Sequence, residues 1–169
     1  MQTTTLSKLL FSLVSLVALL LPSSAQAQLQ EVQQTVFGMD CAPCAYGLEK
    51  RIKRIEGVQS ATVSLDKGLA HIQFQADNQV TLETLRTAVE ESGFSAEEAT
   101  VRITGTLTQE ESQWVLTSAN GERYLLRQGS EVVFENAGRR VTITGTVPKE
   151  KSPAQNAWRL QVTELSAQS

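Results

Sequence analysis

The fold of this chain is decided by residues 38–44, which read Gly-Met-Asp-Cys-Ala-Pro-Cys. Apolar and polar residues alternate through 29–37, just before this stretch, and this alternation predicts a strand. Pro43 disfavours helical backbone at Ala42 and suits the first position of a helix, so we expect a helix to begin near Pro43 or Cys44. The sequence therefore places two cysteines on the turn between a strand and a helix.

The rest of the N-terminal half continues this alternation of helices and strands. In the first helix, Leu48, Ile52 and Ile55 recur at intervals of four and three residues and predict one buried stripe, and Gly57 is expected to end the helix. The order βαββαβ is that of a ferredoxin-like layer, in which two helices lie on an antiparallel sheet. Its other predicted elements are strands at 58–65 and 69–74, a hairpin turn at 66–68, a second amphipathic helix with Leu82, Leu85, Ala88 and Val89 between a Thr81 cap and Gly93, and a short fourth strand before Val101.

Beyond residue 101 short strands replace the helical periodicity. Residues 101–106, Val-Arg-Ile-Thr-Gly-Thr, are echoed by residues 141–146, Val-Thr-Ile-Thr-Gly-Thr, and the echo indicates a repeat or, more simply, two barrel strands with equivalent glycine bends. The strand spacing predicts a small closed or half-closed barrel and resembles oligonucleotide/oligosaccharide-binding (OB) barrels. The predicted strands are 101–107, 114–117, 123–127, 132–134, 140–147 and 158–165.

The predicted fold class is α+β with two domains. A ferredoxin-like βαββαβ metal-binding domain is expected at 28–99, and a small all-β, OB-like barrel of unknown role at 101–169.

Residues 1–27 have the features of a secretory signal peptide. Lys8 is the only charge before Glu31, residues 9–21 are almost wholly apolar, and Ala-Gln-Ala at 25–27 has the small-x-small form of a cleavage site. The alternative is an uncleaved membrane anchor, but the apolar run is shorter than the roughly 20 residues that cross a bilayer. We therefore expect a mature chain that is periplasmic or secreted.

The charge balance argues against nucleic acid as a partner. The chain has 15 basic and 18 acidic residues, so removal of Lys8 with the leader leaves 14 (15 minus 1) against 18 and a net charge of about −4. A basic stripe with interleaved aromatic residues, which would bind single strands, is missing from the sequence. Trp114 and Trp158 are therefore predicted to lie in the core.

The two cysteines point to local chemistry. They are three positions apart, and a disulfide across so short a loop adds little to the stability of a fold. A helix N-terminus stabilises thiolates, and two thiolates are soft ligands that favour Cu(I), Hg(II) or, with a third ligand, Zn(II). In an oxidising compartment the same pair can form a disulfide, which cannot hold metal.

Residues 38–44 in this βαββαβ order resemble the heavy-metal-associated domain of copper chaperones, periplasmic mercury-binding proteins and the N-terminal parts of metal-transporting ATPases. The resemblance covers about residues 31–99 and includes Ile-Glu-Gly-Val at 55–58 and Ser-Gly-Phe at 92–94. Pro43 and the appended second half depart from that family. The resemblance implies that Cys41 and Cys44 are the metal ligands, that Met39 is a buried anchor of the loop and that Phe94 lies near the site.

Other polar residues have two interpretations each. Asp40 is either a solvated loop residue or a third, harder ligand, and an acid before the first cysteine resembles zinc and lead ATPase domains more than copper chaperones. His71 is expected to be a solvated strand residue, because a histidine ligand needs neighbouring donors. A basic face on the first helix is either ordinary solvated surface or a docking patch for an acidic partner; it comprises Lys50, Arg51, Lys53 and Arg54.

The leading functional interpretation is an exported, non-enzymatic carrier or buffer of one soft metal ion per chain, held by Cys41 and Cys44. Cu(I) is favoured over Hg(II) and Zn(II), and the expected partner is a membrane metal-transporting ATPase or another metal-accepting protein. The single histidine argues against a catalytic triad. The alternatives are a thiol-disulfide redox protein and a metal-regulated interaction module.

Overall fold

A computed structural model of the chain describes residues 28–127, 135–153 and 156–167. The predicted leader at 1–27 and the predicted strand at 132–134 lie outside the described residues. Within them, no helix is both long enough and apolar enough to cross a membrane.

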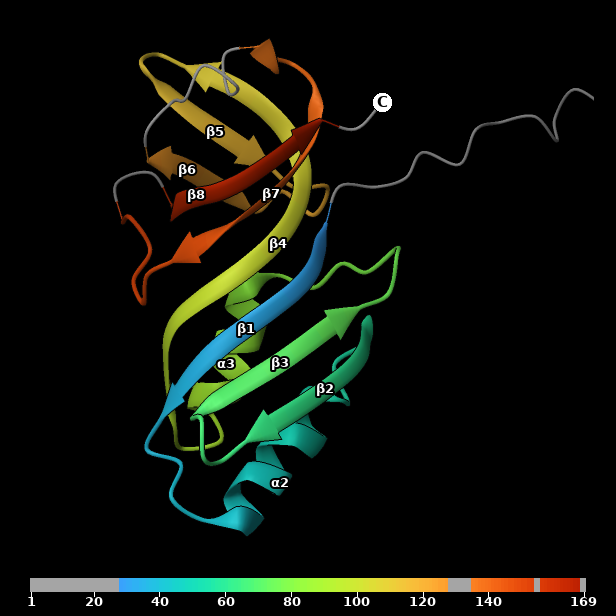
Figure 1. The fold of residues 1–169 in the computed structure, drawn as a ribbon, viewed down its shortest axis with the longest axis vertical. Coiled ribbons are helices and arrows are strands. Elements are labelled where there is room, and N and C mark those ends of the chain that lie inside the picture. The colour runs from blue at the N-terminus through green and yellow to red at the C-terminus, as the bar shows by residue number, and fades with distance from the viewer. Residues whose placement is uncertain (1–27, 128–134, 154–155, 168–169) are drawn as a thin grey trace, which may run out of the picture.

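The N-terminal half has the predicted ferredoxin-like order. Its strands lie in the sequence β2-β3-β1-β4 across an antiparallel sheet, and α2 and α3 cover one face of it (Figure 1). Buried side chains from the sheet and from both helices form one core. The elements are β1 (Leu29–Phe37), α2 (Ala42–Ile52), β2 (Val58–Ser64), β3 (Leu69–Phe74), α3 (Leu82–Glu90) and β4 (Ser95–Glu110).

The first helix ends earlier than predicted. α2 stops at Ile52, and residues 53–57 continue as turns in which Arg54 N and Ile55 N donate to carbonyls three residues back. Ile55 still packs against the core from this turn, so its place in the apolar stripe is correct although it lies outside the helix. Gly57, with φ +93°, takes the left-handed backbone after the turn.

The predicted short fourth strand and the first barrel strand are one continuous strand. β4 is 16 residues long. Along one edge, its residues 95–103 pair with β1 and its residues 106–110 pair with β5. Its other edge pairs with β7 at residues 99–106. The boundary expected at residue 100 therefore falls inside a strand that both halves use, and the side chains of the two halves share one core.

The C-terminal half is a five-stranded barrel. Its strands run β4-β5-β6-β8-β7, and the pairing of β7 with β4 closes the circle (Figure 1). β6 and β8 are parallel, while the other neighbours are antiparallel. Trp114, Tyr124 and Trp158 are buried, as the sequence predicts for the two tryptophans. The new elements are β5 (Gln113–Thr117), β6 (Arg123–Arg127), β7 (Arg140–Val147) and β8 (Trp158–Ala167).

The echoed segments are paired barrel strands, as the simpler interpretation holds. Ile103 faces Ile143 in the β4–β7 ladder, and Gly105 and Gly145 lie two residues away on either side. A Cβ atom at Gly105 would come 2.7 Å from the backbone oxygen of Thr117, so glycine allows the close approach of strands there.

The barrel also contacts the start of α3 through a buried carboxylate, that of Glu122. Its two oxygens accept hydrogen bonds from the backbone of Leu82 at 2.9 Å and of Glu83 at 3.3 Å, which are free donors at the first turn of the helix. Tyr124 Oη and Trp158 Nε1 donate to the same carboxylate, each at 2.7 Å. Burial, and secondarily the Glu122 charge, raises the pKa of Tyr124 well above its ordinary value, so the phenol keeps the proton that it donates.

A second contact joins α3 to the barrel. The guanidinium of Arg86 is buried, lies 4.4 Å from the centre of the Trp158 ring and donates to the carbonyl of Lys149. Lys151 Nζ lies 4.8 Å from the centre of the same ring and pairs with Glu83 of α3 at 2.5 Å. The two halves are thus joined by polar contacts as well as by the shared strand and core.

Candidate metal-binding site

The candidate site lies where β1 leads into α2. Cys41 is the N-cap of the helix, with extended backbone at φ −137° and ψ 143°, and Pro43 stands in the first turn. Cys44 N donates both to Cys41 O at 3.0 Å and to Cys41 Sγ at 3.1 Å. The turn forms as predicted, and both sulfurs lie beside the helix N-terminus. The helix begins at Ala42, one residue before Pro43, so the expectation that Pro43 keeps Ala42 out of the helix is wrong.

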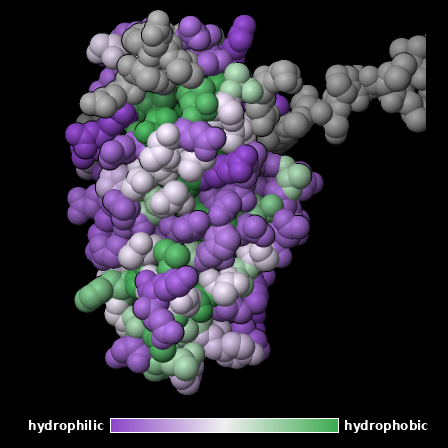
Figure 2. Space-filling view, viewed as in Figure 1, coloured by the Kyte–Doolittle hydropathy of each residue, from purple (hydrophilic) through white to green (hydrophobic). Residues whose placement is uncertain are grey.

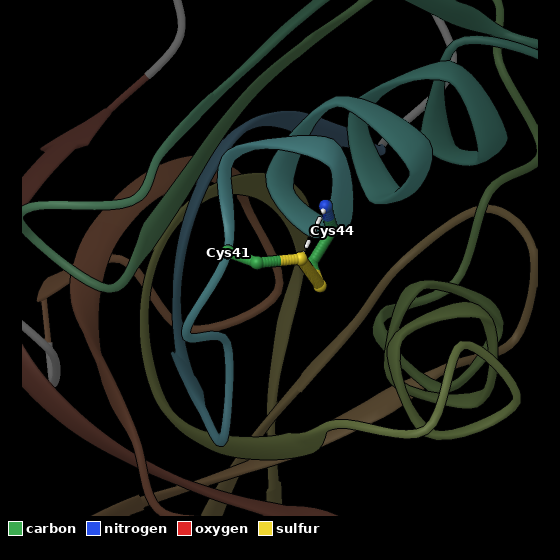
Figure 3. Close-up of a disulfide and its surroundings, with 2 residues drawn as sticks. All are labelled: Cys41 and Cys44. Atoms are coloured by element: carbon green, nitrogen blue, oxygen red, sulfur yellow. Dashed lines mark hydrogen bonds between the residues drawn. A yellow bond between two sulfur atoms is a disulfide. The ribbon is translucent and has the colours of Figure 1, made fainter.

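Cys41 and Cys44 form a disulfide in this structure (Figure 3). This is the oxidised state that the sequence allows for an exported chain, and in it neither sulfur is a thiolate. Both residues are partly exposed, so reagents and metal can reach the pair from solvent. Reduction would release two soft donors at one place on the surface.

Asp40 adds a carboxylate to this pair. An oxygen of Asp40 and the two sulfurs all lie within 4.8 Å of one another, and Asp40 itself is exposed. These three form the group of potential ligands that the described residues bring together. The geometry thus leaves Asp40 in reach of an ion held by the cysteines.

The remaining residues singled out in the sequence fall near the site or away from it. Met39 and Phe94 are partly buried and pack against the core, so Met39 anchors the loop from beneath without being fully buried. His71 lies in β3 and pairs with Glu31 at 2.7 Å, which places it in a separate cluster on the sheet. The expectation of a solvated strand histidine fits its half-exposed side chain.

Basic residues of α2 and of the turn after it border a hollow that Cys44 lines. Cys44, Pro43 and Gly47 line it from the helix start, and Ser92 and Phe94 line it from the segment after α3. Three of the four basic residues line the same hollow, namely Lys50, Arg51 and Arg54, whereas Lys53 pairs with Glu49 at 2.6 Å. The hollow is therefore bordered by basic side chains, and Cys44 but not Cys41 lines it.

Two exposed aromatic residues near the site were not singled out in the sequence. Phe37 is 72% exposed at the end of β1, and Tyr46 is 59% exposed in α2, where Lys50 Nζ lies 4.8 Å from its ring centre. In Figure 2 hydrophilic side chains cover most of the middle of the molecule, and hydrophobic ones are visible both in the barrel half and towards the end at which α2 lies. The sequence could have shown that Phe37 is exposed, because it follows the buried Val36 and so falls on the outward-facing side of the alternating strand.

Comparison with known proteins identifies the N-terminal half. The model of the heavy-metal-associated domain matches residues 34–95. The copper chaperone CopZ of Staphylococcus epidermidis is 36% identical over 59 residues, which are 35% of this chain and 85% of the chaperone. The probable copper-transporting ATPase HMA5 of Arabidopsis thaliana is 41% identical over 61 residues, which are 36% of this chain and only 6% of the ATPase.

Solved structures match the same part of the chain. A copper-binding domain from HMA7, a P-type ATPase, is 32% identical and covers 40% of this chain and 90% of its own, with a TM-score of 0.38. Oxidised MerP from Ralstonia metallidurans CH34 is 28% identical and covers 40% of this chain and 93% of its own, with a TM-score of 0.37.

Proposed function

The chain belongs to the heavy-metal-associated domain family, and we propose that it binds one soft metal ion between Cys41 and Cys44 and delivers or sequesters it outside the cytoplasm. The observation that supports this most is the pair of adjacent sulfurs, partly exposed at the start of α2. Two thiolates there suit linear Cu(I), since soft sulfur donors select soft ions. An exposed two-ligand site also lets an incoming thiolate add before an old one leaves.

Cu(I) is the proposed cargo, with Hg(II) and Zn(II) as alternatives. The relatives are named for copper, which favours this ion. Asp40 supports the zinc alternative, because its carboxylate is close enough to both sulfurs to raise the coordination number that Zn(II) requires. The ion is transferred cargo in this proposal, and the role is non-enzymatic.

The proposed partner is a metal-transporting ATPase or another metal-accepting protein with an acidic surface near its own site. Basic side chains border the hollow that Cys44 lines, so a protein that approaches Cys44 along this hollow contacts Lys50, Arg51 and Arg54. Charge complementarity of this kind increases the rate of association more than the affinity.

Export and the identity of the barrel are parts of the same proposal. The apolar run and cleavage pattern of residues 1–27 support a periplasmic or secreted location. The five-strand circuit, with β6 and β8 parallel, supports an OB-like barrel. We propose that this barrel supports α3 through Glu122 and Arg86, and its further binding role is left open.

The proposal is tested by Cu(I) titration of the reduced chain in competition with a chromophoric Cu(I) chelator. Cys41→Ser and Cys44→Ser should each abolish tight Cu(I) binding, because only one of the two required thiolates remains in either variant. His71→Ala is the matched control, since His71 lies on β3 in a separate ion pair. Full Cu(I) affinity in either serine variant would refute the two-thiolate site.

A further inference from the structure

We propose that metal loading is preceded by thiol-disulfide exchange with a dithiol reductant, whose thiolate attacks Cys44 Sγ and displaces Cys41 Sγ. The observation behind it is the disulfide between these residues, together with the different surroundings of its two sulfurs. The inference rests on the proposed function for its purpose, which is to generate the two thiolates that bind metal. The exchange chemistry itself requires no metal and is tested without it.

Cys41 is the better leaving group of the pair. Its sulfur already accepts a hydrogen bond from Cys44 N at 3.1 Å, at the N-cap of α2 (Figure 3). When the disulfide breaks, the electron pair that stays on Cys41 Sγ is stabilised by this donor and by the positive end of the helix. Exchange is faster when the departing sulfur is stabilised as an anion.

Cys44, and not Cys41, lines the hollow, so the proposed attack comes from the Cys44 side of the disulfide. Cys44 lines this hollow, together with Phe94 on the opposite wall and Lys50, Arg51 and Arg54 at its border. All three basic side chains are exposed, and Arg51 is paired with Glu91 across the gap between the helices. An electropositive approach raises the local concentration of anions, so it favours a thiolate on an acidic surface as the attacking group.

The electrons balance in two exchange steps. The reductant's first thiolate forms a bond to Cys44 Sγ while the bond between Cys44 Sγ and Cys41 Sγ breaks, and Cys41 leaves as a thiolate. The reductant's second thiol gives its proton to water and attacks the first reductant sulfur, which releases Cys44 as a thiolate. The reductant leaves as a disulfide, two electrons have moved to this chain, and both metal ligands are in their binding form.

The mixed disulfide reports which sulfur is attacked. The oxidised chain starting at Gln28 is mixed with glutathione, a monothiol that stops after the first step, and quenched within milliseconds by acid followed by N-ethylmaleimide. Trypsin then releases residues 28–50 as one peptide that contains both cysteines, and fragmentation locates each adduct. We expect glutathione on Cys44 and N-ethylmaleimide on Cys41. Glutathione on Cys41, or divided equally between the two, would overturn the proposal.

The approach through the hollow is tested by charge. In Arg54→Gln the exchange rate with anionic mercaptoethanesulfonate should fall about two- to threefold, while that with cationic cysteamine should not fall, because one nearby positive charge is lost. Arg139→Gln, an exposed position on the barrel, is the matched control and should change neither rate. Equal effects on both reagents would contradict the electropositive route. Failure of the reduced chain to bind Cu(I), with the adduct still on Cys44, would refute the proposed function and leave the exchange step standing.

Discussion

Glu122 offers a quantitative test of the contact between the two halves. Its buried carboxylate accepts four hydrogen bonds, two from the backbone at the start of α3 and two from the barrel side chains Tyr124 and Trp158. In Glu122→Gln one oxygen becomes an NH₂ group, so two of these four donors face another donor. A hydrogen bond to a charged group is worth about 1.5–3 kcal/mol net, so we expect the loss of two to lower the free energy of unfolding by roughly 3–6 kcal/mol.

The assay is denaturant unfolding followed by two probes. Both tryptophans lie in the barrel, and α2 and α3 lie in the N-terminal half, so fluorescence reports on the barrel and circular dichroism at 222 nm reports mainly on α2 and α3. Because the halves share β4 and one core, the two curves should coincide in the wild type. Glu98→Gln is the matched control, since Glu98 is an exposed carboxylate on β4, and it should shift stability by less than about 0.5 kcal/mol.

Two results would refute this reasoning. A Glu122→Gln variant as stable as the Glu98→Gln control would show that the four hydrogen bonds add nothing net to the folded state. Separate transitions for fluorescence and circular dichroism in the wild type would show that the halves fold independently. Two fully separate domains at 28–99 and 101–169 would behave in this way.

Three further predictions follow from the site and the fold. Asp40→Ala should weaken Zn(II) markedly and Cu(I) hardly at all in parallel titrations, and equal losses would show that Asp40 shapes the loop instead. The pKa of Glu49 is lowered in the folded chain, mainly by the hydrogen bond from Lys53 and next by the hydrogen bond from Val63 N. The ionised Glu49 therefore stabilises the fold above the unfolded-state pKa of about 4.3, and this stabilisation is lost as the pH falls through the folded-state pKa. Glu49→Gln should therefore cost up to about 1 kcal/mol at pH 7 and progressively less as the pH falls below about 4.3, and a deficit that does not shrink on acidification would contradict this. A fragment of residues 28–107, which keeps the whole β1 ladder on β4, should retain helical circular dichroism at reduced stability, and an unfolded fragment would show that the barrel is required.

Local patterns were sufficient to predict the N-terminal fold. The apolar stripes of both helices, the Thr81 cap and the turn at Gly68 each act within a few residues, and the structure has all of them. The Thr81 hydroxyl accepts from Thr84 N at 3.0 Å, as the sequence predicts for an N-cap. Cys41 and Cys44 were identifiable because their spacing and their place before the helix are also local features.

Features that depend on distant partners were not predictable. Alternation continues through residue 100 without a turn residue, yet only the pairing of β4 with β1, β5 and β7 shows that one strand serves both halves. Glu122 contacts residues 40 positions away, and no sequence pattern near it distinguishes it from a surface carboxylate. The hollow beside Cys44 likewise joins α2 to Phe94, which lies beyond two strands and a helix.

Native mass spectrometry of the chain, with and without reduction, tests the central claim most directly. It counts the ions bound per chain after addition of one equivalent of Cu(I), and it distinguishes the disulfide from the dithiol by a mass difference of two hydrogens. We predict one Cu(I) in the reduced chain and none in the oxidised chain or in the reduced Cys41→Ser/Cys44→Ser variant. Equal Cu(I) occupancy in the oxidised chain or in the double variant would contradict a metal site built from these two thiolates.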